Sequence, residues 1–474
     1  MMSAAVFWLA AVALCAPSSN TPLERDNVVK IQDDLFQQLF IDQLYGDIIR
    51  TEESETYRAG LVLSGEIQAA EAIEPTFLSY DKLISSPHLL MRLFEEIKAS
   101  HERNTRLAAH SGYLRLRGKL TLPHDDDTED LTSANLFGGI LTFGGFPTLN
   151  CFDLESFNSP IDIAIVGAPF DTGTSYRPGA RFGPEAIRMG ARRLGNGITP
   201  VRGTTPGSKL GTVDPYDPSS HNLSIVDCGD VPMTPFDNRI ALNQLYRGHR
   251  AIHNHTTTGA HLLPYTKVLT MGGDHTITLM ALRSAYEKYG QLAVLHFDSH
   301  IDTWDPKVLG GGLSDYMSLN HGTFLHYAAE NGYLLANSSF HVGLRAPYIS
   351  PDYDRKHDRA CGFSTITARD MDKMGISQIV ETLKTSLGDT PVYISVDIDV
   401  LDPAFAPGTG TMESGGWTTR ELLSVLDGLE GLNVVGGDVV EVSPPYDTNS
   451  EITSLAATAV MDSLLGLLIV QTLK

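Results

Sequence analysis

The sequence is short of basic residues for its length. Its 474 residues include 35 Lys and Arg against 57 Asp and Glu, which gives a formal net charge of −22 at pH 7. A groove for a phosphate backbone would have to form against this negative field, so we expect no nucleic-acid partner. The same field favours the approach of a small cationic molecule. Hydrophobic residues make up 42% of the chain, which is enough for a large core and excludes wholesale disorder.

Cysteine is also scarce. One of the four, Cys15, lies in an apolar N-terminal run, and the other three, Cys151, Cys228 and Cys361, are widely spaced with no CxxC pair. This pattern excludes a disulfide framework, and three remaining cysteines allow at most one bridge.

The longest uncharged apolar run lies at the N-terminus. Residues 4–16 form an uncharged apolar run of 13 residues, too short to span a bilayer but suited to the centre of a signal peptide. No Arg or Lys precedes Arg25, which argues against an organellar transit peptide, and residues 13–16 are small enough for cleavage. We therefore predict a signal peptide over 1–16 and a mature protein that is secreted or held in the secretory-pathway lumen. The alternative is a buried N-terminal helix, because only the terminal amine supplies positive charge. No later run is predicted to span a membrane.

Three N-x-S/T sequons support secretion only together with the signal peptide, because such short matches often arise by chance. In the secretory pathway we expect a glycoprotein with its glycans on surface loops, at Asn222, Asn254 and Asn337.

Residues 17–133 are predicted to be an N-terminal extension, partly helical or flexible, without recognisable chemistry. Helix-like apolar spacing covers 29–50 and 81–102, whereas the tract HDDDTED at 124–130 has the acidic composition of a solvated linker. Residues 134–474 are predicted to form the functional domain.

From residue 161 onward, short apolar runs alternate with amphipathic helical patterns. The apolar runs are typical of strands buried on both faces, and they lie at 161–169, 221–231, 267–275, 291–302, 338–345, 390–400 and 433–444. Helical patterns fall between them at 276–290, 377–388 and 418–431. This alternation predicts an α/β fold with one doubly wound, mainly parallel sheet, whose carboxyl edge should carry the chemistry.

Acidic and imidazole side chains are concentrated at the ends of three of these strands. In DSHID and DID they occupy alternate positions, and alternate side chains of an extended segment face the same side. A third strand ends in MGGDH, whose two glycines allow a tight turn before the histidine. We therefore expect four carboxylates and two imidazoles to converge: His275, Asp298, His300, Asp302, Asp397 and Asp399.

Buried carboxylates at this density repel one another and lose their solvation, so they need cations to neutralise them. Four negative charges match two divalent ions. Oxygen and nitrogen donors without thiolate favour Mn²⁺ over structural Zn²⁺, and the two imidazoles disfavour Mg²⁺. The sequence therefore predicts two Mn²⁺ per chain. For any one of these residues alone, the alternative is a turn cap or a hydrogen-bonded core residue.

The segments that carry these residues resemble the signature motifs of the ureohydrolases, the arginase and agmatinase family. They are GGDH (272–275), HFDSHID (296–302), SVDIDVLDPAFAPGTGT (395–411) and VVEVSPPYD (439–447), with further similarity to agmatinases at 137–151 and 167–188. The resemblance implies a three-layer α/β/α arginase-like fold, two manganese ions, hydrolysis of a guanidino group to urea and an amine, and assembly into trimers or hexamers.

Hydrolysis of a guanidinium is difficult because resonance makes its carbon a poor electrophile. Two metal ions lower the pKa of a shared water and hold the resulting hydroxide, and a carboxylate is needed to orient the planar cation. By resemblance Glu441, at the end of the last strand, takes that orienting role; the alternative is a structural salt bridge. Asp302 is expected to serve as both metal bridge and proton carrier. The HGT motif resembles the family's proton-shuttling segment, which assigns that role to His321, whereas His326 is expected outside the cleft.

Three further acidic residues near these motifs are expected to be capping or outer residues rather than ligands: Asp274, Asp305 and Asp402.

The sequence departs from the agmatinase pattern in two places. Residues 303–320 are longer and richer in glycine than that pattern, and we expect them to line the mouth of the cleft. They lack the Asn and Ser/Thr cluster with which arginases bind the amino-acid end of arginine, which disfavours arginine as substrate. Further on, Met412 and Ser414 replace family prolines and Trp417 follows, and we expect these changes to alter the pocket wall.

We predict a small cationic guanidino substrate, namely agmatine, cleaved to putrescine and urea. A guanidino acid such as 4-guanidinobutanoate is the nearest alternative, for which Lys307 or Arg177 could supply a cation. A secreted binding protein that kept the fold and lost turnover is an alternative of another class, and the full ligand set argues against it. A one-zinc deacetylase on a related fold is disfavoured because its chemistry uses fewer carboxylates.

Overall fold

The computed structural model describes residues 138–473, except 154–158, 196, 203–206, 260–262 and 311–317. The predicted signal peptide and the whole N-terminal extension, with its helices at 29–50 and 81–102 and its linker at 124–130, lie outside the described residues. Thr132–Lys474 is a compact unit of its own. The domain boundaries given above therefore stay predictions.

One eight-stranded sheet forms the centre of this unit, and every pairing in it is parallel. The strands are β1 (Ile163–Gly167), β2 (Ile225–Asp230), β3 (Lys267–Met271), β4 (Ala293–Phe297), β5 (Ser339–Leu344), β6 (Phe363–Thr367), β7 (Pro391–Asp397) and β8 (Asn433–Val440). Their order across the sheet is β2-β1-β3-β8-β7-β4-β5-β6. Seven of them lie inside the apolar runs predicted from sequence, and the parallel α/β fold is confirmed.

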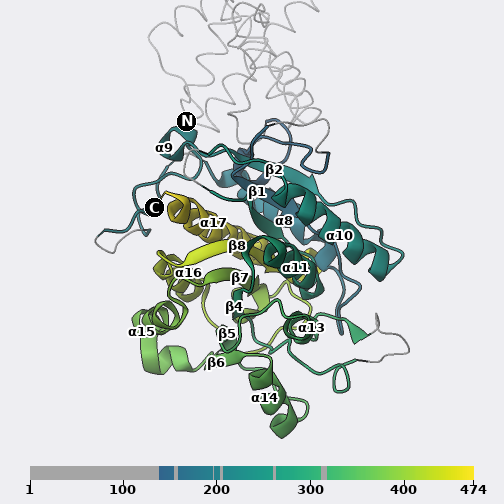
Figure 1. The fold of residues 1–474 in the computed structure, drawn as a ribbon. Coiled ribbons are helices and arrows are strands. Elements are labelled where there is room, and N and C mark those ends of the chain that lie inside the picture. Colours follow the sequence, from purple (N-terminus) through teal and green to yellow (C-terminus); the bar gives the residue numbers. More distant parts are fainter. Residues whose placement is uncertain are drawn as a thin grey trace, which may run out of the picture. The chain divides into compact units, whose positions relative to one another are not determined.

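Helices cover both faces of the sheet (Figure 1). On one face α10 packs on α11 and α11 on α13, while on the other α8, α17, α16 and α15 pack in series. The described α-helices are α8 (Gly183–Gly190), α9 (Pro218–His221), α10 (Asn238–His253), α11 (Thr278–Tyr289), α13 (Phe324–Glu330), α14 (Pro351–Ala360), α15 (Asp370–Leu387), α16 (Thr419–Gly428) and α17 (Ile452–Thr472). Short 3₁₀ turns occur at η1 (Phe143–Gly145), η2 (Ala180–Phe182), η3 (Ala191–Arg193), η4 (His275–Ile277), η5 (Ile398–Val400) and η6 (Pro444–Tyr446).

The alternation of side chains along each strand divides the core into two layers. In β1, Ile163 and Ile165 join the cluster that includes α17, whereas Ala164 and Val166 join the cluster that includes α10. Because both faces are buried, these strands carry apolar residues at nearly every position, and this pattern is what made them visible in the sequence.

Helix α17 is apolar on all sides. It has 21 residues with a hydropathy of 1.8, which is long and apolar enough to cross a membrane, and it is the one helix of the described chain that passes this test. We expected no later run to resemble a membrane span, and by length and composition α17 does resemble one, so that expectation was wrong. Within the domain, 83% of its most apolar window is buried, because α8, α16 and strands β3 and β8 pack around it.

One disulfide joins Cys151 to Cys228, which ties the segment before β1 to strand β2. Cys361 is a free, buried cysteine. The side chains of the three sequon asparagines are exposed, as expected for surface sites: Asn222, Asn254 and Asn337.

Candidate active site

The carboxyl ends of four adjacent strands bring the predicted site residues together. Strands β3, β8, β7 and β4 are neighbours in the sheet (Figure 1). His275 and Glu441 follow β3 and β8, Asp397 ends β7, and Asp298 follows β4. All four side chains are buried.

The first group of possible metal ligands surrounds His275. Its Nδ1 lies 3.1 Å from Oδ2 of Asp298, 3.1 Å from Oδ2 of Asp302 and 3.4 Å from Oδ2 of Asp397. Ligand atoms of His275, His296, Asp298 and Asp302 all lie within 4.8 Å of one another, so one ion could reach them together.

The second group lies beside the first and shares a carboxylate with it. Nδ1 of His300 is 3.3 Å from Oδ1 of Asp298 and 3.0 Å from Oδ2 of Asp399, and these three residues also satisfy the 4.8 Å limit. The structure therefore places Asp298 in both groups and Asp302 in only one. The expectation that Asp302 bridges two metals stays a prediction, and the carboxylate shared by the two groups is that of Asp298.

Turns, rather than strand alternation, make these side chains converge. Strand β4 ends at Phe297, so Asp298, His300 and Asp302 lie beyond it, and Asp302 adopts a positive φ of 50°. Carboxylates accept backbone N–H groups two residues on: the amide of His300 donates to Asp298 at 2.6 Å, and that of Asp399 donates to Asp397 at 2.8 Å. The reasoning from an extended DSHID segment was wrong, although its residues do converge.

The glycines before His275 serve a close approach and not a turn with positive φ. A Cβ at Gly273 would lie 1.9 Å from the carbonyl oxygen of Phe170, which no side chain can tolerate. The amide of Asp274 donates to the same carbonyl at 2.7 Å. This contact fixes the loop after β1 against the turn that presents His275.

The buried carboxylates at this edge of the sheet are unfavourable without cations, and they include Asp397, which belongs to neither group of possible ligands. Burial, together with the charges of Asp399 and Asp298, raises the pKa of Asp397 well above its usual range. Burial and the charge of Asp298 likewise raise the pKa of Asp399. Burial opposes the charge on His300, but the surrounding carboxylates raise its pKa well above the ordinary value. Positive charge is therefore favoured at this edge of the sheet.

Several buried atoms here lack hydrogen-bond partners within the described chain. They are Nδ1 of His275, Nε2 of His296, Oδ2 of Asp298 and Oδ2 of Asp399. Buried polar groups are rarely left unpaired, and metal coordination would satisfy atoms of this kind. The donor set of imidazole nitrogens and carboxylate oxygens fits Mn²⁺.

His296 is a member of the first group that the sequence reasoning missed. Its Nε2 lies 3.0 Å from Oδ2 of Asp298, and its Nδ1 lies 2.8 Å from Nδ1 of His341. Nε2 of His341 in turn lies 2.9 Å from Oδ1 of Asp358. This buried chain orients the His296 ring toward the ligand groups. The available signal was that His296 stands two residues before Asp298, at the end of an otherwise apolar strand.

Glu441 and His321 form one hydrogen-bonded unit. Oε1 of Glu441 lies 3.0 Å from Nδ1 of His321 and accepts the backbone N–H of His275 at 2.9 Å. Oε2 of Glu441 is buried and has no hydrogen-bond partner among the described residues. The Glu441 backbone has a positive φ of 61°, which costs energy for a side chain of this size.

On its other side, His321 contacts the loop after β1. In the neutral ring Nε2 accepts the amide of Ser175 at 3.0 Å, and it lies 2.8 Å from the Ser175 hydroxyl, which can accept from the protonated ring. Burial opposes protonation, but the hydrogen bond to Glu441 and nearby carboxylate charges raise the pKa of His321 to about 9. The described lining of the neighbouring cavity includes neither His321 nor His326, so the expectation that His326 lies outside the cleft stays a prediction.

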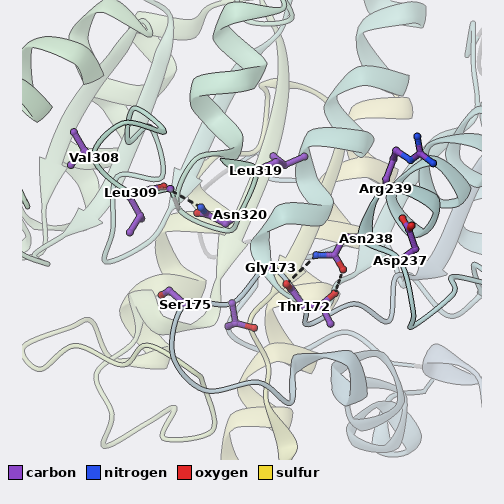
Figure 2. A pocket seen from close by; sticks show the side chains of 12 residues that line it. Thr172, Gly173, Ser175, Asp237, Asn238, Arg239, Val308, Leu309, Leu319 and Asn320 are labelled. Carbon is purple, nitrogen blue, oxygen red and sulfur yellow. Dashed lines mark hydrogen bonds between the residues drawn. The ribbon is translucent and has the colours of Figure 1, made fainter. Parts of the chain in front are cut away.

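A cavity of about 1000 Å³ opens beside Ser175 (Figure 2). Both ends of the long loop line it, through Val308, Leu309 and Asn320, as was expected for residues 303–320. The opposite side is formed by the loop after β1 and by the start of α10, where Thr172 and Asn238 are joined by hydrogen bonds of 2.6 and 3.1 Å. Asp237 and Arg239 also lie on this side.

The charged residues of this cavity differ from those expected. Arg239, and not Lys307 or Arg177, is the described cation of the lining. The Arg177 guanidinium lies 5.0 Å from the ring centre of Tyr176 and 5.3 Å from that of Tyr446.

The expected change in the pocket wall at Met412 and Ser414 stays a prediction; Oε1 of Glu413, between them, lies 3.9 Å from Nε2 of His300. Trp417 is 2% exposed and belongs to the main core, where its Nε1 donates to the carbonyl of Ala368 at 3.1 Å. Met412 and Ser414 are not among the described lining residues.

The three acidic residues assigned to capping act as such. Asp274 accepts the amides of Thr276 and Gly173, Asp305 accepts that of Lys307, and Asp402 accepts those of Ala404, Gly415 and Gly416.

Comparison with known proteins identifies the family. The family model described as "Arginase family" matches residues 161–466, which include every predicted ligand, His321 and Glu441. The chain belongs to the arginase family.

Named relatives share most of its length. "Putative agmatinase 1" of Schizosaccharomyces pombe is 43% identical over 361 residues, covering 73% of this chain and 86% of the relative. Mitochondrial guanidino acid hydrolase of Homo sapiens is 36% identical over 307 residues, covering 65% of this chain and 78% of the relative. The solved structure of proclavaminate amidino hydrolase from Streptomyces clavuligerus has a TM-score of 0.59 at 34% identity, covering 71% of this chain and all of that one.

These comparisons confirm an arginase-family protein of the agmatinase-like branch with the arginase-like α/β fold. The chain is a hydrolase that acts on guanidino groups.

Proposed function

We propose that this arginase-family protein is a two-manganese hydrolase that cleaves agmatine to putrescine and urea. The observation that carries the proposal is the unpaired Oε2 of Glu441, buried beside the candidate ligand groups. A carboxylate oxygen in this position suits a planar guanidinium, which can donate two parallel hydrogen bonds to a carboxylate.

The six residues predicted from sequence would hold the two ions, and Asp298 belongs to both groups of possible ligands. Bound manganese would supply Lewis acidity and lower the pKa of a coordinated water, which is what attack on a guanidinium carbon requires. The protein's part is to fix the substrate carbon at that position, and Glu441 does this from the end of β8.

His321 and Asp302 are proposed to handle protons. His321 links Glu441 to Ser175 at the cavity, so it can pass a proton between the buried edge and the departing amine. Oδ2 of Asp302 lies 3.1 Å from Nδ1 of His275, among the first group of possible ligands. Asp302 would therefore bind one ion and accept a proton close to it.

The cavity supports two kinds of substrate tail. Asp237 suits the terminal ammonium of agmatine, and Arg239 suits the carboxylate of a guanidino acid such as 4-guanidinobutanoate. The negative net charge and the similarity to an agmatinase-named relative favour agmatine. Arg239 is the specific observation that keeps the guanidino acid as second candidate.

Urea release from agmatine, 4-guanidinobutanoate, 3-guanidinopropanoate and arginine, measured on the manganese-loaded protein, tests this function. We expect the highest kcat/KM for agmatine and the lowest for arginine. Asp237→Asn should lower kcat/KM for agmatine, while Arg239→Gln should lower it for the guanidino acid. Asn caps a helix as well as Asp does, so the first variant removes a charge without removing the cap of α10.

A fully metal-loaded protein that released urea from none of these compounds would overturn the proposal and favour a silent binding protein. A preference for the guanidino acid that Arg239→Gln abolishes would establish the second candidate. Assembly into a trimer or hexamer is a further proposal, tested by light scattering of the purified protein.

A further inference from the structure

Two helices outside the candidate active site carry a second cluster of metal-ligating side chains. We propose that His326, His357 and Cys361 bind a Zn²⁺ ion. His326 lies on α13, His357 lies in the last turn of α14, and Cys361 caps that helix. Their ligand atoms lie within 4.8 Å of one another, and the cluster shares no residue with the two groups described above.

The spacing of the ligand atoms fits a tetrahedral zinc ion. Nδ1 of His326 lies 3.0 Å from Nε2 of His357, which lies 3.7 Å from Sγ of Cys361. Zinc bonds of about 2.0 Å to nitrogen and about 2.3 Å to sulfur imply separations of about 3.3 Å between nitrogens and about 3.6 Å between nitrogen and sulfur. Small side-chain adjustments would therefore admit the ion.

The local backbone sets this spacing in advance. His357 and Cys361 are four residues apart at the end of α14, so they face the same side of one helical turn. The amide of Cys361 donates to the carbonyl of His357 at 2.9 Å, which continues the helical geometry to the cysteine. Only His326 has to be supplied from another element.

A shell of neighbouring groups orients the His357 ring. The ring of Tyr353 stacks on it with centres 5.9 Å apart and planes 6° apart, and the Tyr353 hydroxyl donates to Asp305 at 2.5 Å. Histidine ligands in metal sites are commonly held by such outer partners. The carboxylates of Glu330 and Asp305 lie near His326 and would partly offset the charge of an ion, although burial and the charge of His357 outweigh them and lower the pKa of His326.

The donor set selects the metal. Two imidazoles and a thiol suit Zn²⁺, whereas Mn²⁺ prefers oxygen, so the two sites would select different ions. His326 and His357 are half-buried and Cys361 is buried, which leaves room for a water as fourth ligand.

Such an ion would fasten α13 to α14. Helix α13 begins three residues after His321, and α14 also carries Asp358, which bonds to His341 of the buried histidine chain. A zinc ion here would stabilise the elements next to the candidate active site without taking part in its chemistry. The site does not depend on the proposed function.

Cobalt substitution tests the proposal. Co²⁺ bound by a thiolate gives a charge-transfer absorption that an oxygen and imidazole centre cannot give. Titration of Co²⁺ into the manganese-loaded full chain should produce this absorption, saturating at one equivalent per chain and disappearing when Zn²⁺ is added. His326→Gln and His357→Gln should each weaken Co²⁺ binding at this site by at least tenfold.

The controls separate this site from the other cysteines and from the manganese centre. Cys361→Ser should abolish the absorption while urea release stays unchanged. Cys151 and Cys228 are joined in a disulfide and supply no thiolate, and Asp399→Asn should retain the absorption. Absence of the absorption in the unaltered protein, or its persistence in Cys361→Ser, would overturn the proposal. Since His326 is half-buried on a helix surface, His326→Gln gives an independent test if Cys361→Ser folds poorly.

Discussion

Asp399 shows how one residue can be destabilising without metal and essential with it. It is fully buried and lies close to Asp298, and its nearest cationic partner in the second ligand group is His300. Burial and like charge raise its pKa, so the folded protein without metal disfavours its ionised form.

Asp399→Asn should therefore have opposite effects in the two states. With Mn²⁺ present we expect one ion to be lost and kcat to fall by more than 100-fold, since loss of even an outer partner costs about 10- to 100-fold. Without metal the variant should melt at a higher temperature than the unaltered protein, because a repulsive charge is gone. Metal analysis, urea release and thermal melting measure these effects.

Asp402→Asn is the matched control, because Asp402 accepts only backbone amides nearby and should keep both ions. Two bound ions and normal turnover in Asp399→Asn would show that the ligand assignment is wrong.

Glu441 and His321 should behave as one unit because they share a hydrogen bond of 3.0 Å. Glu441→Gln keeps the shape but removes the charge, and we expect kcat/KM to fall by about 100-fold, the effect of about 3 kcal/mol for a buried charged hydrogen bond. His321→Asn should lower kcat mainly, with partial rescue by added imidazole. The double variant should be little worse than the poorer single one.

Metal content should remain at two ions per chain in all three variants. The shared role would be contradicted if the double variant lost as much activity as the two single variants together, in free-energy terms. Loss of manganese from His321→Asn would also contradict it.

At the scale of the element, α10 contains two buried histidines that should make stability depend on pH. Burial lowers the pKa of His249 to about 4, and burial together with neighbouring positive charge lowers that of His253 to about 3. In the unfolded chain both titrate near the ordinary value of about 6.5. Below that pH the unfolded state binds more protons, so the free energy of unfolding should fall as pH decreases from about 6.5 toward 4.

The size of this effect is about 1.4 kcal/mol per pH unit for each buried histidine. His253→Gln can still bond to Ser284, which lies 2.7 Å from the histidine ring, and it should reduce the loss between pH 6.5 and 5 by about 2 kcal/mol. Urea unfolding at both pH values measures this change. Equal pH dependence of the unfolding free energy in the two proteins would show that His253 is protonated in the folded state. Both proteins contain the same metal centre, so its contribution to the pH dependence drops out of the comparison.

Strands with a continuous apolar run could be predicted from sequence, including the edge strand β2. Strand β6 was missed because only Phe363 and Ile366 of its five residues are buried, so it lacks the continuous apolar run of the central strands. The strand ends were predicted too long, since nothing in a local pattern shows that β4 leaves the sheet at Phe297. Helix α17 gave no amphipathic signal because both of its sides are buried.

The candidate site could be predicted wherever its residues follow one another in a motif. The six ligands and Glu441 stand at strand ends, so topology alone brings them to one edge. His296 could not be recognised as part of the site, because the residue that orients its ring, His341, is 45 positions away in the sequence. Arg239 could not be placed, because only the packing of α10 beside the loop after β1 brings it to the cavity.

For the whole molecule, processing and location remain predictions of the sequence. We propose that the mature chain begins near Ala16 and carries N-glycans on at least one of the three exposed sequon asparagines. The disulfide between Cys151 and Cys228 is consistent with an oxidising compartment. N-terminal sequencing and a glycosidase mobility shift of the native protein test this, and an intact Met1 would contradict secretion.

The central claim is that two manganese ions at the edge of the sheet make the protein a guanidino-group hydrolase. Its most direct test is the rate of urea release from agmatine as Mn²⁺ is titrated into metal-free protein, with bound metal measured at each point. We predict no urea without metal and a rate that saturates at two bound Mn²⁺ per chain. Urea release by the metal-free protein, saturation at one ion, or no urea at full occupancy would contradict the account.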